Sequence, residues 1–146
     1  MSRKRIRSPE RTVIVAGHGA EAVSAAARAY DGSAEIVLQT EQNGTGHAVL
    51  CAQDTLEGAQ GDVLVLYGDT PFISPETLTR MTKARARFDV VVLGFEAADP
   101  ARYGRLVMDG DTLERIVEFK DASDEERAIS FCNSGVIRCS VEHMFA

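Results

Sequence analysis

The sequence has 146 residues, the length of one domain, and its 45% hydrophobic and 26% charged residues are typical of a globular protein with a real core. Sixteen Lys and Arg residues against 22 Asp and Glu residues give a net charge of −6, which argues against nucleic acid as a partner. No apolar run approaches the roughly 20 residues that cross a bilayer, and the amino end has no signal-peptide core. We therefore expect a cytoplasmic protein with no membrane contact.

The three cysteines, Cys51, Cys132 and Cys139, show neither close pairing nor the spacing of metal ligands. We interpret them as small, mostly buried thiols. The only basic cluster lies at Arg3, Lys4, Arg5 and Arg7, and it is more typical of a loose leader than of a binding patch.

The first part of the chain alternates between predicted strands and helices. Residues 12–16 form a β-branched run that ends at Gly17-His18-Gly19, residues 20–30 an alanine-rich helix, and residues 35–38 the next strand. This order predicts a β-α-β unit with parallel strands. The elements expected after it are a polar loop at 39–46, a helix at 47–56, a buried strand at 63–66, a helix at 77–88 that starts near Ser74-Pro75, and a strand at 89–95.

The pattern changes after residue 97. Residues 105–108 and 113–118 flank Asp109-Gly110-Asp111, which predicts a β-hairpin. A charged segment at 120–127 precedes a strand at 130–139, interrupted by Asn133-Ser134-Gly135. The whole pattern predicts an α/β fold with a Rossmann-like, mostly parallel sheet and a β-hairpin insertion.

The buried strand at 63–66 delivers Tyr67, Gly68 and Asp69 at its carboxyl end. Ligands of open α/β sheets bind in the crevice beyond these strand ends, so Asp69 is a candidate carboxylate for the metal ion of a nucleotide. The alternative is that Gly68 and Asp69 only turn the chain.

Two glycine-containing loops could approach a ligand closely. Gly17-His18-Gly19 matches no nucleotide-binding fingerprint and is typical of a plain turn. The loop at 39–46 offers the amide of Gln39, the backbone of Gly44 and the hydroxyl of Thr45 near a helix start. Its alternative is an ordinary connection in which Thr45 caps the helix.

Further candidates lie in the second half of the chain. Gly104 could let a sugar ring approach the backbone, and Glu118 and Lys120 would project to one face if their strand continued. Asn133 could face a cleft, or it could make a local turn with Ser134-Gly135. The three histidines are too scattered for a metal site or a triad, and we interpret His47 as packing at its helix start.

Five segments in order, LQTEQNGTGHAV, VLVLYGDTPFI, RYGRLV, IVEFKDAS and CNSGV, resemble the uridyltransferase domain of the bacterial bifunctional N-acetylglucosamine-1-phosphate uridyltransferase/glucosamine-1-phosphate acetyltransferase. The resemblance runs from about residue 13 to residue 146. It implies a sheet of the nucleotide-diphospho-sugar transferase type and synthesis of UDP-N-acetylglucosamine and pyrophosphate from UTP and N-acetylglucosamine 1-phosphate with Mg²⁺.

The resemblance also implies roles for single residues. It implies that Gln39, Gly44 and Thr45 bind the uracil side of the nucleotide, and that Asp69 of the Tyr67-Gly68-Asp69 triplet binds Mg²⁺. It implies that Gly104, Glu118 and Asn133 contact the sugar side of the substrate.

The chain also departs from the family. Nothing in residues 1–11 matches the glycine-rich loop and lysine that hold the triphosphate, and the second metal ligand, the acetyltransferase half and the trimer contacts of the family lie beyond Ala146. We therefore expect a disordered basic leader at 1–11 and an incomplete nucleotidyltransferase domain at 12–146 with impaired turnover. The alternatives are a different sugar-1-phosphate nucleotidyltransferase or a fragment that binds nucleotide sugars without catalysis.

Overall fold

The computed structural model describes residues 9–146, so most of the predicted leader lies outside the described residues. The chain divides into two compact units. Unit 1 contains the chain up to Gly61 with Met144–Ala146, and unit 2 contains Asp62–His143. Each unit is described by itself below.

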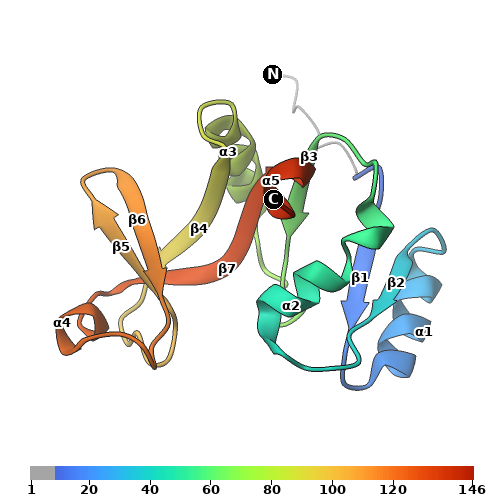
Figure 1. The fold of residues 1–146 in the computed structure, drawn as a ribbon, viewed down its shortest axis with the longest axis horizontal. Helices are drawn as coiled ribbons and strands as arrows, with labels where there is room; N and C mark the ends of the chain where they lie inside the picture. The colour runs from blue at the N-terminus through green and yellow to red at the C-terminus, as the bar shows by residue number, and fades with distance from the viewer. Residues whose placement is uncertain (1–8) are drawn as a thin grey trace. The chain divides into compact units, whose positions relative to one another are not determined.

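Unit 1 contains the predicted β-α-β arrangement. Strand β1 pairs in parallel with β2, with Val13 opposite Glu35 and Ala16 opposite Leu38, and helix α1 packs against β1 (Figure 1). The crossover helix makes the two strands parallel, as predicted. The elements are β1 (Val13–Ala16), α1 (Ala20–Tyr30), β2 (Glu35–Leu38), α2 (Gly44–Cys51) and the short 3-10 helix η1 (Asp54–Leu56).

Helix α2 differs from the prediction at both ends. It begins at Gly44 rather than His47, and after Cys51 the chain continues into η1 instead of extending the helix. Asn43 occupies the N-cap position and makes no side-chain cap, and Thr45 lies inside the helix. The interpretation of Thr45 as a helix cap is therefore wrong.

Arg11 lies in the described part of the predicted leader. Its guanidinium Nε is 2.9 Å from Glu35 Oε1, and its Nη2 donates to the backbone carbonyl of Thr55 at 2.6 Å. The hydrogen bonds from Arg11 hold the pKa of Glu35 below its ordinary value. Arg11 thus connects β2 with η1.

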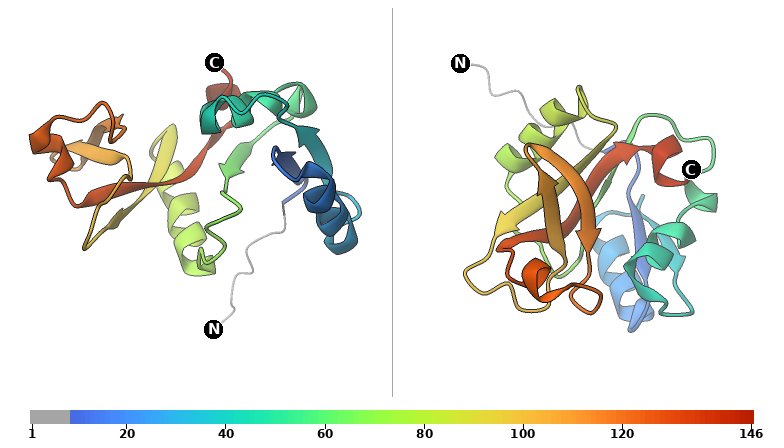
Figure 2. Two further views of the ribbon diagram at one scale, coloured as in Figure 1. Left: turned by 90° about the horizontal axis from the view of Figure 1, so that it is seen from below. Right: turned by 60° about the vertical axis from the view of Figure 1, so that its left-hand side comes forward.

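Unit 2 is organised around the ten-residue strand β7. Its edges pair with β3, β4 and β5, and β5 forms a hairpin with β6 (Figures 1 and 2). The elements are β3 (Asp62–Val65), α3 (Pro75–Arg85), β4 (Val90–Glu96), β5 (Arg105–Asp109), β6 (Thr112–Val117), α4 (Asp124–Arg127), β7 (Phe131–Ser140) and α5 (Val141–Met144).

The α/β class is confirmed, but the strand directions differ from the prediction in one respect. Strands β3 and β4, joined through helix α3, both run antiparallel to β7, which lies between them. They are therefore parallel to each other, as a crossover predicts, without being neighbours. Within residues 9–146 the strand pairs of this sheet are all antiparallel, because β7 separates β3 from β4.

The core of unit 2 is centred on the same strand. Val136 and Cys132 are fully buried, and Leu106 and Met81 pack with 3% exposure. Cys139 is also buried, and desolvation raises the pKa of its thiol. The predicted burial of Cys132 and Cys139 is confirmed, whereas Cys51 in unit 1 is only half-buried.

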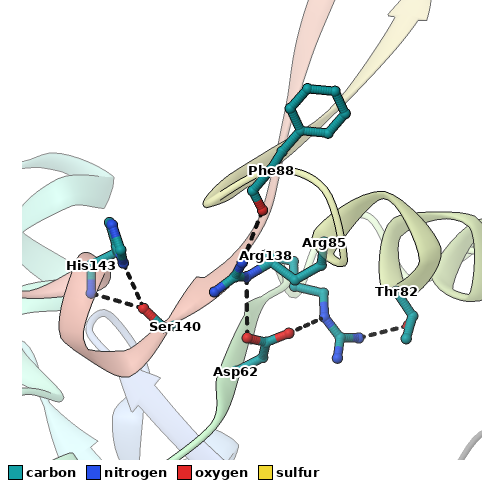
Figure 3. A network of polar contacts seen from close by, with 7 residues as sticks. All are labelled: Asp62, Thr82, Arg85, Phe88, Arg138, Ser140 and His143. Carbon is teal, nitrogen blue, oxygen red and sulfur yellow. Dashed lines mark hydrogen bonds and ion pairs between the residues drawn. The ribbon is translucent and has the colours of Figure 1, made fainter.

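A polar network holds the amino end of β3. The carboxylate of Asp62 lies 3.1 Å from Arg85 Nε on α3 and 3.0 Å from Arg138 Nε on β7, and Arg138 also donates to Thr82 Oγ1 (Figure 3). Three elements therefore meet at one carboxylate, opposite the strand end that carries Tyr67. None of the helices between residues 9 and 146 is long and apolar enough to cross a membrane.

Candidate functional site

The turn after β3 presents Asp69. The backbone N–H and the hydroxyl of Thr70 both donate to the carbonyl of Tyr67 at 3.2 Å, which closes a tight turn. Asp69 is exposed, and its carboxylate makes no hydrogen bond or ion pair with the described residues. A Cβ added at Gly68 would meet no atom of the described residues within 4 Å. The turn therefore offers an accessible carboxylate at the carboxyl end of β3.

Strand β7 carries a bulge at the predicted interruption. Strand β4 pairs Val92 with Ile137 but Gly94 with Asn133, so the register shifts between these two pairs. The Ser134 hydroxyl donates to the carbonyl of Leu93 at 2.6 Å, which bridges the bulge to β4. The extra β7 residues are thus anchored rather than loose.

Asn133 makes the local turn that was one of its two interpretations. Its Oδ1 accepts a hydrogen bond from the N–H of Gly135 at 2.9 Å. Gly135 has a φ of 79°, and a Cβ there would lie 2.6 Å from Tyr67 Cζ. Because Gly135 has no side chain, the Tyr67 ring can pack against its backbone beside the bulge.

Three residues of the predicted sugar side meet in unit 2. The N–H of Asn133 donates to the carbonyl of Gly104 at 2.8 Å. The Glu118 carboxylate lies beside Gly104, with Oε1 3.4 Å from the position that a Cβ would take there. Gly104 is buried and Glu118 is exposed. The missing side chain of Gly104 therefore lets the Glu118 carboxylate lie close to the backbone there.

The strand that would place Glu118 and Lys120 on one face does not continue to these residues. Strand β6 ends at Val117, and the N–H of Asp121 donates to the Glu118 carbonyl at 2.9 Å, which closes a turn. Strand alternation therefore does not apply to these two side chains. Glu118 reaches Gly104 because the chain turns there.

Arg105 is a buried residue that sequence reasoning did not single out. It is 2% exposed, and within residues 9–146 its guanidinium donates only to backbone carbonyls, those of Pro100, Ala101, Tyr103 and Arg127. It also lies over the ring of Phe119, 5.8 Å from the centroid. The loop before Gly104 and the end of α4 are thereby tied together. An arginine at the start of the apolar run RLVM was the available signal.

The predicted uracil-side residues lie in unit 1. The Gln39 side-chain nitrogen is 3.0 Å from the Gly44 carbonyl oxygen and 3.1 Å from His47 Nδ1. Thr45 is exposed in the first turn of α2. Gln39 and Gly44 are therefore in direct contact, and His47 joins them, although its sequence interpretation was packing alone. A histidine in the helix that follows the glutamine loop was the signal.

The residues present fit a magnesium ion. Within residues 9–146 no group of three or more His, Cys, Asp or Glu side chains forms a metal cage. Magnesium is usually held by one or two carboxylates while waters and substrate phosphates complete its shell. The exposed carboxylate of Asp69 suits this mode of binding.

The family follows from a match that covers most of the chain. The model of the MobA-like NTP transferase domain family matches residues 3–134. The chain belongs to this family. It is therefore a nucleotidyltransferase domain.

Two curated relatives of this nucleotidyltransferase domain are bifunctional proteins. The bifunctional protein GlmU of Ruegeria sp. strain TM1040 is 68% identical over 137 residues, which cover 94% of this chain and 30% of that protein. GlmU of Ruegeria pomeroyi is 66% identical over 141 residues, which cover 97% and 31%. The chain therefore spans about a third of the length of these relatives, and the resemblance inferred from its motifs is confirmed.

Solved structures share the fold at lower identity. HddC from Yersinia pseudotuberculosis superposes with a TM-score of 0.68 at 21% identity, over 93% of this chain and 58% of that one. A putative glucose-1-phosphate thymidylyltransferase from Bacillus anthracis gives 0.70 at 19% identity, over 90% and 53%. These likenesses establish the nucleotide-sugar transferase fold.

Proposed function

We propose that this chain is a uridylyltransferase domain that makes UDP-N-acetylglucosamine and pyrophosphate from UTP and N-acetylglucosamine 1-phosphate. The observation that supports this most is the meeting of Gly104, Glu118 and Asn133, which come from three separate motifs. The chain also has high-identity relatives that are GlmU proteins. The proposal includes a cytoplasmic location, where UTP is available.

The proposed roles follow the chemistry of each group. On the nucleotide side, Gln39 binds the uracil edge, and Gly44 and Thr45 lie beside it at the start of α2. On the sugar side, the Glu118 carboxylate accepts hydrogen bonds from sugar hydroxyls and Asn133 donates through its amide nitrogen. Gly104 leaves room for the ring.

The reaction requires positioning more than a nucleophilic side chain. An oxygen of the sugar phosphate attacks the α-phosphorus of UTP, a new P–O bond forms, and the bond to the β-phosphate oxygen breaks as pyrophosphate leaves. Tyr67 and Gly68 hold the turn that presents Asp69. Magnesium bound by Asp69 would offset the negative charge of the phosphates.

Calorimetric titration of the chain with UDP-N-acetylglucosamine and Mg²⁺ tests the proposal. We expect binding by the wild type and about ten-fold weaker binding by Gly104→Ala, because the added methyl group occupies the space beside the Glu118 carboxylate. Gly32→Ala, where a Cβ meets only Arg28 O at 4.0 Å, is the matched control. Absence of binding by the wild type would overturn the proposal.

Competition and turnover separate the rival functions. Tighter binding of dTDP- or GDP-sugars than of UDP-N-acetylglucosamine would indicate a different nucleotidyltransferase. Pyrophosphate release from UTP, N-acetylglucosamine 1-phosphate and Mg²⁺ tests the expectation of impaired turnover, which a rate equal to that of a full-length relative would contradict. Binding without any turnover would favour a nucleotide-sugar-binding role.

A further inference from the structure

We propose that His47 is a positioning residue that fixes the orientation of the Gln39 amide and thereby makes this site select uridine over cytidine. The proposal rests on the proposed function, in which Gln39 meets the base. It concerns residues of unit 1 only, and its geometric part can be tested without any ligand.

The orientation of the Gln39 amide follows from its two contacts. The side-chain atom 3.0 Å from the Gly44 carbonyl oxygen must be the amide nitrogen, because a carbonyl oxygen only accepts hydrogen bonds. The same nitrogen lies 3.1 Å from His47 Nδ1. An amide nitrogen does not accept hydrogen bonds, so Nδ1 must be the acceptor. We therefore assign the ring proton of His47 to Nε2.

His47 is itself held in place. It lies in α2, one turn before Cys51, and the Cys51 sulfur is 4.0 Å from both ring nitrogens. The ring is half-buried, which limits the rotamers that it can adopt. With Gly44 and His47 each taking one amide hydrogen, both donors of Gln39 are used within the protein.

The remaining polar atom of the amide is then Oε1, a pure acceptor. It lies 3.6 Å from the position that a Cβ would take on Gly17, and the amide nitrogen of Gln42 lies 3.8 Å from the same position, so a side chain on residue 17 would crowd this oxygen. Uracil presents an N3–H donor between its two carbonyl groups, whereas N3 of cytosine carries a lone pair. A fixed acceptor therefore pairs with uracil and repels cytosine.

The test compares the affinity of UDP-N-acetylglucosamine with that of its CDP analogue by calorimetry. We expect the wild type to favour the uridine ligand by at least about ten-fold, and His47→Leu to narrow this ratio by about five-fold, the effect of one lost hydrogen bond. His47→Asn should retain the ratio, because its Oδ1 can replace Nδ1 as acceptor. His143→Leu, an exposed histidine of unit 2, is the matched control.

The ring nitrogen resonances of the wild type test the geometry without a variant. We expect the ¹⁵N spectrum of His47, assigned by its disappearance in His47→Asn, to show an unprotonated Nδ1 and a protonated Nε2 at neutral pH. A protonated Nδ1, or an unchanged base ratio in folded His47→Leu, would overturn the inference. Failure of the wild type to bind either ligand would instead overturn the proposed function.

Discussion

Gly135 lies in the β7 bulge with a φ of 79°, and its N–H donates to Asn133 Oδ1 while its Cα faces the Tyr67 ring. Two constraints therefore act at this position. The left-handed backbone conformation disfavours any side chain, and the ring occupies the space that a side chain would need. One residue thus connects the asparagine of the sugar side with the turn that presents Asp69.

We expect Gly135→Ala to lower the free energy of unfolding by about 3 kcal/mol, the sum of backbone strain and overpacking against Tyr67. Urea denaturation measures this change. Gly46→Ala is the control, since a Cβ there meets nothing within 4 Å in the part of the chain that the structure describes. Equal stability of the two variants would contradict the packing of Tyr67 on Gly135.

Helix α4 has only four residues, and contacts at both ends stabilise it. At its start the Ser123 hydroxyl accepts from the N–H of Glu126, and a Glu126 carboxylate oxygen accepts from the N–H of Ser123 at 2.8 Å. At its end the Arg127 carbonyl accepts from the buried guanidinium of Arg105. A segment this short would not be helical without such contacts.

The capping carboxylate makes stability depend on pH. The backbone N–H of Ser123, and then Arg115 at 2.7 Å, hold the pKa of Glu126 below its ordinary value. The stabilisation is therefore present above the unfolded-state pKa of about 4.3, and it is lost as the pH falls through the lower folded pKa.

We expect Glu126→Gln to reduce the loss of stability on acidification from about pH 6 to about pH 3, because the amide does not titrate there. The urea midpoint at each pH measures this dependence. Glu125→Gln is the control, because the Glu125 side chain is exposed and makes no hydrogen bond among the described residues. An identical pH dependence in Glu126→Gln and the wild type would contradict the capping role.

At the scale of elements, features set by the local sequence were predicted better than pairings between strands that are distant in the sequence. The hairpin of β5 and β6 followed from Asp109-Gly110-Asp111, and helix α3 starts where Ser74-Pro75 indicated, with Ser74 accepting from the N–H of Thr77. The antiparallel pairing of Val65 with Ile137 was missed, because nothing local specifies a partner 72 residues away. The position of Glu118 was missed for a different reason, because a local turn closed by the N–H of Asp121 on the Glu118 carbonyl, rather than strand alternation, sets it.

At the scale of the whole molecule, the candidate residues divide between the two units. Gln39, Gly44 and Thr45 belong to unit 1, and Asp69, Gly104, Glu118 and Asn133 belong to unit 2. The motifs predicted which residues to consider. Within unit 1 Gln39 contacts Gly44, and within unit 2 Gly104 contacts Asn133 and Glu118. The two halves of the proposed substrate can therefore be tested separately.

We expect Gln39→Ala to weaken binding of uridine monophosphate by about ten-fold and to leave binding of N-acetylglucosamine 1-phosphate unchanged. Glu118→Ala should have the opposite pattern, because its carboxylate is assigned to sugar hydroxyls. Calorimetric titration with each ligand measures both effects, and each variant serves as the control for the other. A variant that weakens both ligands equally would contradict the division.

The central place of β7 has a consequence for folding during synthesis. Strands β3, β4 and β5 all pair with β7, which follows them in the chain. While the ribosome is still adding residues 131–140, these strands have exposed edges and the apolar side chains around Val136 have no partner. Unit 2 therefore completes its sheet only after β7 has left the ribosome. We expect the nascent chain to be most prone to aggregation just before that point.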